Sequence, residues 1–254
     1  MGTVKQEPRR RMQSLNIRFE NGSERAFRHR GTRADLGVIT QIFEAQDYSL
    51  KPLQRGAELQ DLYDRIAAAG QVPLVLDAGA NIGASVLYFA QAFPRAHIVA
   101  IEPARNNFEV LQANAAGLDV DARRAAIGAA AGDTPLVDPG AGEWGYRTAA
   151  GAAGEQVRVL SATRLVAEKR AAGQVPFIAK IDIEGGEAEL FSRDTEWLDL
   201  FPLLIVELHD WLLPRAGSSR NFLRCIAERD RDFVFLGENV FSIANQWTAG
   251  PFHV

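Results

Sequence analysis

The chain has 254 residues, of which 47% are hydrophobic and 24% charged, enough for one sizeable core and with no sign of a disordered or fibrous chain. Its formal net charge of −4 argues against a protein that binds mainly by neutralising many phosphates. Cys225 is the single cysteine, so neither an internal disulfide nor a thiolate zinc site is expected.

The chain begins with MGTVKQEPRRRMQ, which is basic but has no apolar run behind it. No stretch approaches the ~18 apolar residues that span a bilayer, so we expect a cytoplasmic protein. We expect residues 1–35 to form an N-terminal extension, partly disordered within residues 1–13, and residues 36–254 to form a single domain. Leu59, Leu62, Tyr63 and Ile66 recur at helical spacing and predict a helix that Gly70 ends.

From Pro73 onward, apolar runs of strand length alternate with longer helical patterns: LVLDA, ASVLYFAQAF, HIVAIE, ARNNFEVLQANAA and a weaker strand over residues 120–126. Such alternation is typical of βαβ units whose parallel sheet is buried on both faces. Residues 128–154 are rich in Gly, Ala and Pro, which predicts a long loop with at most a short strand, bordering the site.

Regular patterns return in the last third of the chain. They predict a helix within QVRVLSATRLVAEKRAAG, a strand at FIAKIDIEG, a helix start at EAELF, a strand at LLIVELH and a helix at SRNFLRCIAERD. Two strand-like pieces, DFVFLG and NVFSI, are joined around Glu238 and predict a hairpin. The whole pattern predicts an α/β, doubly wound fold.

A glycine-containing turn from Val75 to Gly83 lies between a predicted strand and a predicted helix. A dinucleotide site would need G-x-G-x-x-G, yet Asn81 stands at the middle position. Asp77 would repel a pyrophosphate but suits a ligand with an ammonium group, and S-adenosylmethionine has that ammonium and no phosphate. Glu102, at the end of the next strand, can accept hydrogen bonds from both ribose hydroxyls. An oxidoreductase with an NAD-type cofactor stays open as the alternative enzyme.

Four blocks, VLDAGANIGASVLYFA, AIEPARNNFEVLQANAA, AKIDIEGGEAELF and LLIVELHDWL, together resemble the FkbM family of methyltransferases over residues 47–243. The resemblance implies an S-adenosylmethionine-dependent methyltransferase with a class I (Rossmann-like) seven-stranded sheet that ends in an antiparallel hairpin. It places Tyr48 in a segment that covers the cofactor, within reach of the cofactor carboxylate. It implies cofactor contacts from Asp77, Gly79, Ala80, Asn81, Gly83, Glu102, Pro103, Asn107, Ala126 and Asp182.

Enzymes of this family are associated with hydroxyl acceptors, which implies O-methylation of a small molecule, a sugar or a polyketide-type natural product. A hydroxyl must lose its proton as it attacks the methyl group. Asp182 and Glu184 follow one predicted strand, whereas Glu207, His209 and Asp210 follow the next, so all should face one crevice. We take His209 as the candidate general base, with Asp182 as its catalytic neighbour.

A second hypothesis is that this cluster binds a divalent cation such as Mg²⁺, with Asp182, Glu207 and either His209 or Asp210 as ligands. Glu184 and Gly185 belong to a turn that substrate or cofactor could approach, and Glu187 could complement the dipole of the helix that follows.

Two other classes were weighed. A non-catalytic cofactor-binding protein could share the fold, although retention of Asp182, Glu184 and His209 argues against it. A nucleic-acid methyltransferase is disfavoured by the acidic balance and by the lack of an Asn- or Asp-Pro-Pro-aromatic motif. We therefore expect a small-molecule partner and neither nucleic acid nor a membrane.

Overall fold

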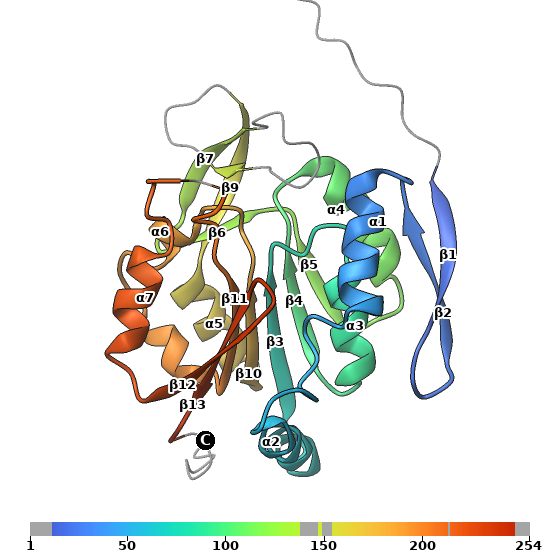
Figure 1. The fold of residues 1–254 in the computed structure, drawn as a ribbon, viewed down its shortest axis with the longest axis horizontal. Coiled ribbons are helices and arrows are strands. Elements are labelled where there is room, and N and C mark those ends of the chain that lie inside the picture. Colours follow the sequence, from blue (N-terminus) through green and yellow to red (C-terminus); the bar gives the residue numbers. More distant parts are fainter. Residues whose placement is uncertain (1–11, 138–146, 149–153, 213, 247–254) are drawn as a thin grey trace, which may run out of the picture.

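A computed structural model describes residues 12–137, 147–148, 154–212 and 214–246. A seven-stranded sheet in the order β12-β13-β11-β10-β3-β4-β5 forms the centre of the molecule, with helices on both faces (Figure 1). Only the contacts of β13 with β11 and β12 are antiparallel, as the resemblance implied. The strands are β3 (Val72–Ala78), β4 (His97–Ile101), β5 (Val120–Arg123), β10 (Gln174–Ile181), β11 (Leu203–Glu207), β12 (Arg231–Leu236) and β13 (Asn239–Ala244).

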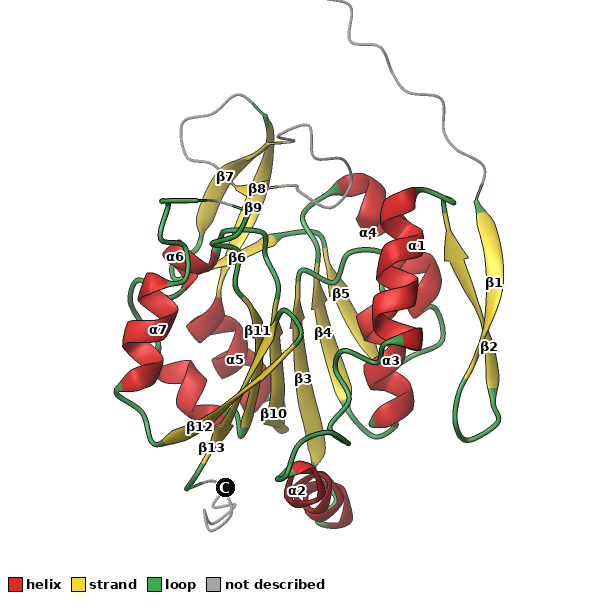
Figure 2. Cartoon of the chain, viewed as in Figure 1, coloured by secondary structure: helices red, strands yellow, loops and turns green. Residues whose placement is uncertain are grey.

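Both faces of the sheet are buried because alternate residues of each central strand enter different cores. In β3, Val75 packs in one core, while Leu74 and Leu76 pack in the other. The first core is covered by α1 (Arg33–Ile39), the π-helical η1 (Thr40–Glu44), α2 (Gly56–Ala68), α3 (Ala84–Ala92) and α4 (Arg105–Ala115). The second is covered by α5 (Ala162–Ala171), α6 (Glu187–Leu190), the 3₁₀ helix η2 (Glu196–Leu200) and α7 (Arg220–Ala227) (Figure 2).

The N-terminal region contributes a hairpin that the sequence patterns did not predict, made of β1 (Gln13–Arg18) and β2 (Glu24–His29). Ile17 and Phe27 of this hairpin are buried in the first core. Asn114 of α4 binds the backbone of Arg28, since its Oδ1 accepts from the amide at 2.7 Å and its Nδ2 donates to the carbonyl at 3.0 Å. Residues 12–29 are therefore packed onto the rest of the fold, while residues 1–11, where disorder was expected, lie outside the described residues.

A second sheet stands beyond the carboxyl ends of the central strands (Figure 1). Its strands, in the order β6-β9-β7-β8, are β6 (Ala126–Gly128), β9 (Glu155–Ser161), β7 (Gly132–Val137) and β8 (Arg147–Thr148). The region 128–154, for which we expected a long loop with a short strand, contains the strands β7 and β8, because β7 pairs antiparallel with β9 over Gly132–Leu136. Residues 138–146 and 149–153 of that region lie outside the described residues.

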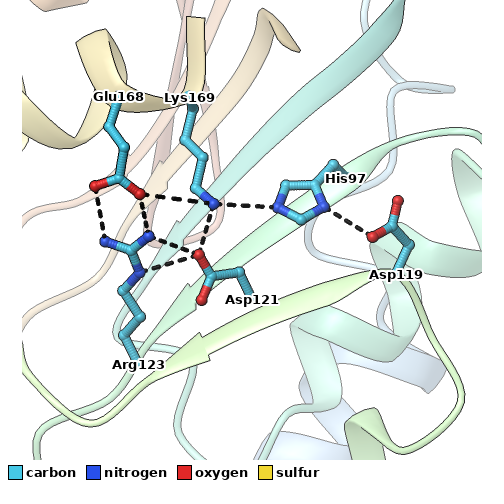
Figure 3. Close-up of polar contacts among 6 residues, drawn as sticks. All are labelled: His97, Asp119, Asp121, Arg123, Glu168 and Lys169. Carbon is cyan, nitrogen blue, oxygen red and sulfur yellow. Dashed lines mark hydrogen bonds and ion pairs between the residues drawn. The ribbon is translucent and has the colours of Figure 1, made fainter. Parts of the chain in front are cut away.

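A charged network fastens α5 to the edge strand β5 (Figure 3). The Asp121 carboxylate accepts hydrogen bonds from Lys169 at 2.6 Å and from Arg123 at 2.7 Å, and Arg123 also pairs with Glu168. Burial opposes the charge of Asp121, but these two cations outweigh it and lower the pKa of the carboxyl to about 2.

Across the residues covered by the structure, no helix combines the length and apolarity needed to cross a bilayer.

Candidate functional site

The turn after β3 has a backbone path that requires glycine. Gly79 has φ of +79°, and a Cβ there would lie 1.6 Å from the backbone oxygen of Asp182. Gly83, just before α3, has φ of +86°, and its Cβ would lie 2.8 Å from the side chain of Leu111. Asn81 between them is also left-handed, at +48°. The predicted tight turn is confirmed, and at Gly79 the close neighbour is strand β10.

Glu102, at the end of β4, has its carboxylate held by two backbone amides. The amide of Asn81 donates to Oε2 at 3.0 Å and that of Ala104 to Oε1 at 2.8 Å. Burial raises the pKa of Glu102 to about 7 in spite of these bonds. A carboxylate has about four acceptor positions. These two bonds and a long one from Asn107 Nδ2 to Oε1 use three of them, so Oε2 keeps a position for a ligand hydroxyl.

The hairpin reaches Glu102 through a chain of side chains that sequence reasoning missed. Arg30, just after β2, donates to Oδ1 of Asn107 at 2.9 Å, and Nδ2 of Asn107 donates to Glu102 at 3.5 Å. Arg30 is itself bound by the buried Asp35. No local pattern around Arg30 signals this role, because the contact joins segments 77 residues apart in the chain.

Next to the turn and Glu102 lies a pocket that is lined by residues at the ends of several strands. Half of the predicted site residues line it: Gly79, Asn81, Glu102, Pro103, Asn107, Ala126, Asp182 and Glu184. Gly186 lines it in place of its predicted neighbour Gly185. The structure thus brings the carboxyl ends of β3, β4 and β10 together around one space.

Four predicted cofactor residues are not among those that line this cavity: Asp77, Ala80, Gly83 and Tyr48. Asp77 is wholly buried, accepts a hydrogen bond from Ser85 Oγ at 2.6 Å and lies 3.2 Å from Lys180 Nζ. This differs from the expectation that Asp77 faces a ligand ammonium, because its carboxylate is already paired inside the protein. Tyr48 is buried too, and its ring stacks on Phe89 at 5.6 Å.

Lys180 of β10 is the main site residue that sequence reasoning overlooked. Its Nζ donates to the backbone oxygen of Gly79 at 2.7 Å and lies 3.5 Å from Asp182, and only 2% of the side chain is exposed. Burial disfavours the ammonium, yet Asp77 outweighs it and raises the pKa of Lys180. Burial likewise opposes the charge of Asp182, but Lys180 holds the pKa of that carboxyl below its usual range. The available signal was the two-residue spacing from Asp182, which places both on one face of β10.

Behind the cavity wall, His209 lies among four carboxylates. Its Nδ1 is 2.8 Å from Oε1 of Glu187, and both residues are buried. Its Nε2 is 3.5 Å from Asp182, 3.5 Å from Glu207 and 3.7 Å from Glu184. Glu187 was expected only to complement a helix dipole, whereas the structure buries it and pairs it with His209. The predicted meeting of the β10 and β11 ends is confirmed by these distances.

The protonation of this cluster follows from burial and mutual repulsion. Burial and the charge of Asp182 raise the pKa of Glu184 to about 7 and that of Glu207 to about 8. Burial opposes a charge on His209, but the contacts with Asp182 and Glu187 outweigh it and raise its pKa to about 11. The imidazole of the bare cluster therefore carries a proton, and it could accept one only after giving this proton up. Its assignment as the general base stays a prediction.

Of the two sets of metal ligands that the sequence predicts, the structure brings together the one that contains His209. Asp182, Glu207 and His209 each offer a ligand atom, and these atoms lie within 4.8 Å of one another. Asp210, the third ligand of the set Asp182, Glu207 and Asp210, is outside this group and accepts a hydrogen bond from Ser218 Oγ at 3.4 Å. His209 therefore replaces Asp210, and a set that includes imidazole nitrogen suits Mg²⁺ less well than an all-oxygen set would.

Three similar solved structures are distant from this chain in sequence, and their TM-scores are below 0.5. The O-methyltransferase TomG from Streptomyces achromogenes, solved in complex with SAM, is 16% identical, with 82% of this chain and 90% of that chain covered and a TM-score of 0.44. Cofactor-bound Rv0187 from MTB is 16% identical, with 84% and 91% covered and a TM-score of 0.43. Monomeric WbdD is 15% identical at a TM-score of 0.42, with 76% of this chain and 41% of that chain covered. Identities this low speak to the fold alone.

At the level of sequence, methyltransferase sdnD of Sordaria araneosa is 41% identical over 78 residues, which are 29% of this chain and 30% of that protein. The match therefore spans less than a third of that relative's length. A family model described as a methyltransferase FkbM domain matches residues 77–235, from the end of β3 to β12. Because this match covers more than half of the 254 residues and includes the turn, Glu102 and the His209 cluster, the chain belongs to the FkbM methyltransferase domain family.

Proposed function

We propose that this methyltransferase moves the methyl group of S-adenosylmethionine to a hydroxyl of a small molecule, a sugar or a polyketide-type natural product, in the cytoplasm. One observation carries the proposal: the amide-held carboxylate of Glu102 and the turn at Gly79 share a cavity with Asp182. Methyl transfer follows from the family, and the cofactor and the acceptor class are the proposed steps.

The cofactor would lie across the carboxyl ends of β3 and β4. Its ribose hydroxyls would bind the carboxylate of Glu102, whose oxygens are oriented before any ligand arrives. Its methionine end would lie at the turn of Gly79, which lines the same cavity. Lys180 and Asp77 would hold that turn in place from inside the protein.

The acceptor would enter beside Asp182 and Glu184, which line the same cavity. Its oxygen attacks the methyl carbon of the sulfonium, the carbon–sulfur bond breaks, S-adenosylhomocysteine leaves, and the hydroxyl proton passes to a group of the cluster. The two carboxylates that face the cavity and His209 behind them supply the negative charge and the proton positions that this step needs. Replacement of His209 by Ala should therefore slow methyl transfer more than it weakens cofactor binding.

The test uses purified protein, S-adenosylmethionine labelled in its methyl group, and a panel of hydroxyl compounds. We expect label in at least one hydroxyl compound and a rate lower by on the order of 100-fold in His209→Ala, with cofactor affinity retained. His97→Ala is the matched control, because His97 lies at the start of β4, away from the cluster, and pairs with Asp119 just before the edge strand β5. Tight cofactor binding with no turnover on any acceptor would favour the non-catalytic alternative instead.

A further inference from the structure

The environment of His209 differs from that of an ordinary buried histidine. The side chain is 1% exposed, and its Nε2 finds no hydrogen-bond partner among the residues that the structure describes. A buried polar nitrogen without a hydrogen-bond partner destabilises the folded state, so its retention calls for a ligand. This nitrogen faces Asp182 and Glu207, each with a carboxylate oxygen 3.5 Å away.

These separations match the spacing of ligands around one ion. Two ligand atoms that each lie ~2.1 Å from a shared ion are ~3–3.5 Å apart, whether the arrangement is octahedral or tetrahedral. The separations of Nε2 from the oxygens of Asp182 and Glu207 agree with this value, and Glu184 lies only slightly further, at 3.7 Å. They are also longer than the ~2.7–3.2 Å that is usual for N–H···O hydrogen bonds, so these two separations suit a shared ion better than a direct hydrogen bond.

The other side of the imidazole supports the same interpretation. Glu187 is fully buried and binds Nδ1 at 2.8 Å, which fixes the ring so that Nε2, once it gives up its proton to an incoming ion, directs its lone pair at the cluster. A carboxylate that binds the second nitrogen of a ligating histidine is the usual support of a protein metal site. Asp182 can serve both neighbours, because Oδ2 faces Lys180 while Oδ1 faces His209.

We infer that Asp182, Glu207 and His209 form a site for a first-row divalent transition ion such as Mn²⁺, with Glu184 as a further oxygen ligand at the cavity wall. The donor set of one imidazole nitrogen with carboxylate oxygens suits such an ion better than Mg²⁺. The inference deepens the proposed function, on which its role in catalysis rests, since the ion would lie where the acceptor hydroxyl enters. When bound, the ion would lower the pKa of that hydroxyl.

The experiment measures binding of Mn²⁺ alone to the full chain, after EDTA treatment and removal of the chelator. Free Mn²⁺ is read by electron paramagnetic resonance, without cofactor or acceptor. We expect one ion per chain in the native protein and an affinity lower by on the order of 10–100-fold in Glu187→Gln, which keeps the ligands but loses the carboxylate behind the imidazole. His209→Ala should lose the site, and Mg²⁺ should compete only at much higher concentration.

The matched control is Asp210→Asn, which removes a neighbouring carboxylate that lies outside the cluster and should leave Mn²⁺ affinity unchanged. If His209→Ala fails to fold, the isosteric Glu207→Gln replaces it. Less than a fifth of an ion per native chain, or equal losses in Asp210→Asn and Glu207→Gln, would overturn the inference. Calorimetry of S-adenosylmethionine with the same metal-free protein distinguishes failure of the ion site from failure of the proposed function. Cofactor binding without Mn²⁺ binding would refute the ion site and leave the proposed function standing.

Discussion

Replacement of Lys180 by Met tests how the glycine turn is held. Lys180 is 2% exposed and Asp77 is fully buried, and their charged atoms are 3.2 Å apart. At an effective dielectric constant of ~20, that distance corresponds to ~5 kcal/mol of attraction before the cost of desolvation. Because Lys180→Met leaves Asp77 charged and buried without its cation, we expect the free energy of unfolding to fall by ~3–5 kcal/mol.

The double variant Asp77→Asn with Lys180→Met removes both charges, so it should recover on the order of 2 kcal/mol relative to Lys180→Met alone. Urea unfolding of the metal-free proteins measures these differences. Lys51→Met is the matched control, since Lys51 and its partner Glu20 are 66% and 63% exposed and the pair should be worth less than ~1 kcal/mol. A loss below ~1 kcal/mol in Lys180→Met, or a double variant no more stable than it, would refute this reasoning.

Three further outcomes follow from the same geometry. Gly79→Ala should abolish cofactor binding in calorimetry, whereas Gly117→Ala, at a similar φ of +77° but with nothing within 4 Å of the new Cβ, should retain it; equal binding would contradict the close contact. Glu102→Gln tests the raised pKa of Glu102. Because the pKa of this carboxyl is about 7 in the folded protein and about 4.5 in the unfolded chain, the native protein should lose stability as the pH rises between these two values. Relative to native, the variant should gain up to ~3 kcal/mol over that window in urea unfolding, and parallel curves would show that Glu102 titrates normally. Asp121→Asn should lower the free energy of unfolding by ~1 kcal/mol at pH 7, after allowance for solvent screening. Because the pKa of Asp121 is lowered in the folded protein, this loss should shrink as the pH falls below about 4. A loss that does not depend on pH would disprove the charge-based account.

The central strands could be predicted because burial on both faces makes them continuous apolar runs. LVLDA, HIVAI and LLIVE stand out for this reason, and each became a strand of the sheet. The hairpin of residues 13–29 could not, because charged residues such as Arg18, Glu24 and Arg28 dilute its short alternation and its burial depends on α4. β7 was hidden in the same way, since Asp133 and Pro135 weaken its strand pattern and its partner β9 lies further along the chain.

The site divides along the same line. Gly79, Asn81 and Glu102 could be found because a local pattern of strand, turn and helix carries their role. Contacts that join distant segments could not be found in this way. Glu187 is an example: an acid at the start of a helix is explained by the helix dipole, and only the fold shows that Glu187 contacts His209. The surroundings of Asp77 could not be predicted for another reason: a position at a strand end does not tell whether a carboxylate points to a ligand or to a buried lysine.

The most direct test of the account is calorimetry of S-adenosylmethionine with the native protein and with Glu102→Ala. A hydrogen bond from a ribose hydroxyl to the Glu102 carboxylate should contribute ~1.5–3 kcal/mol, so the account predicts one cofactor per native chain and at least ~10-fold weaker binding by the variant. Glu109→Ala, which removes a largely exposed acid of α4, should bind as the native protein does. Association of NAD in place of S-adenosylmethionine, or equal affinity in the native protein and Glu102→Ala, would contradict it.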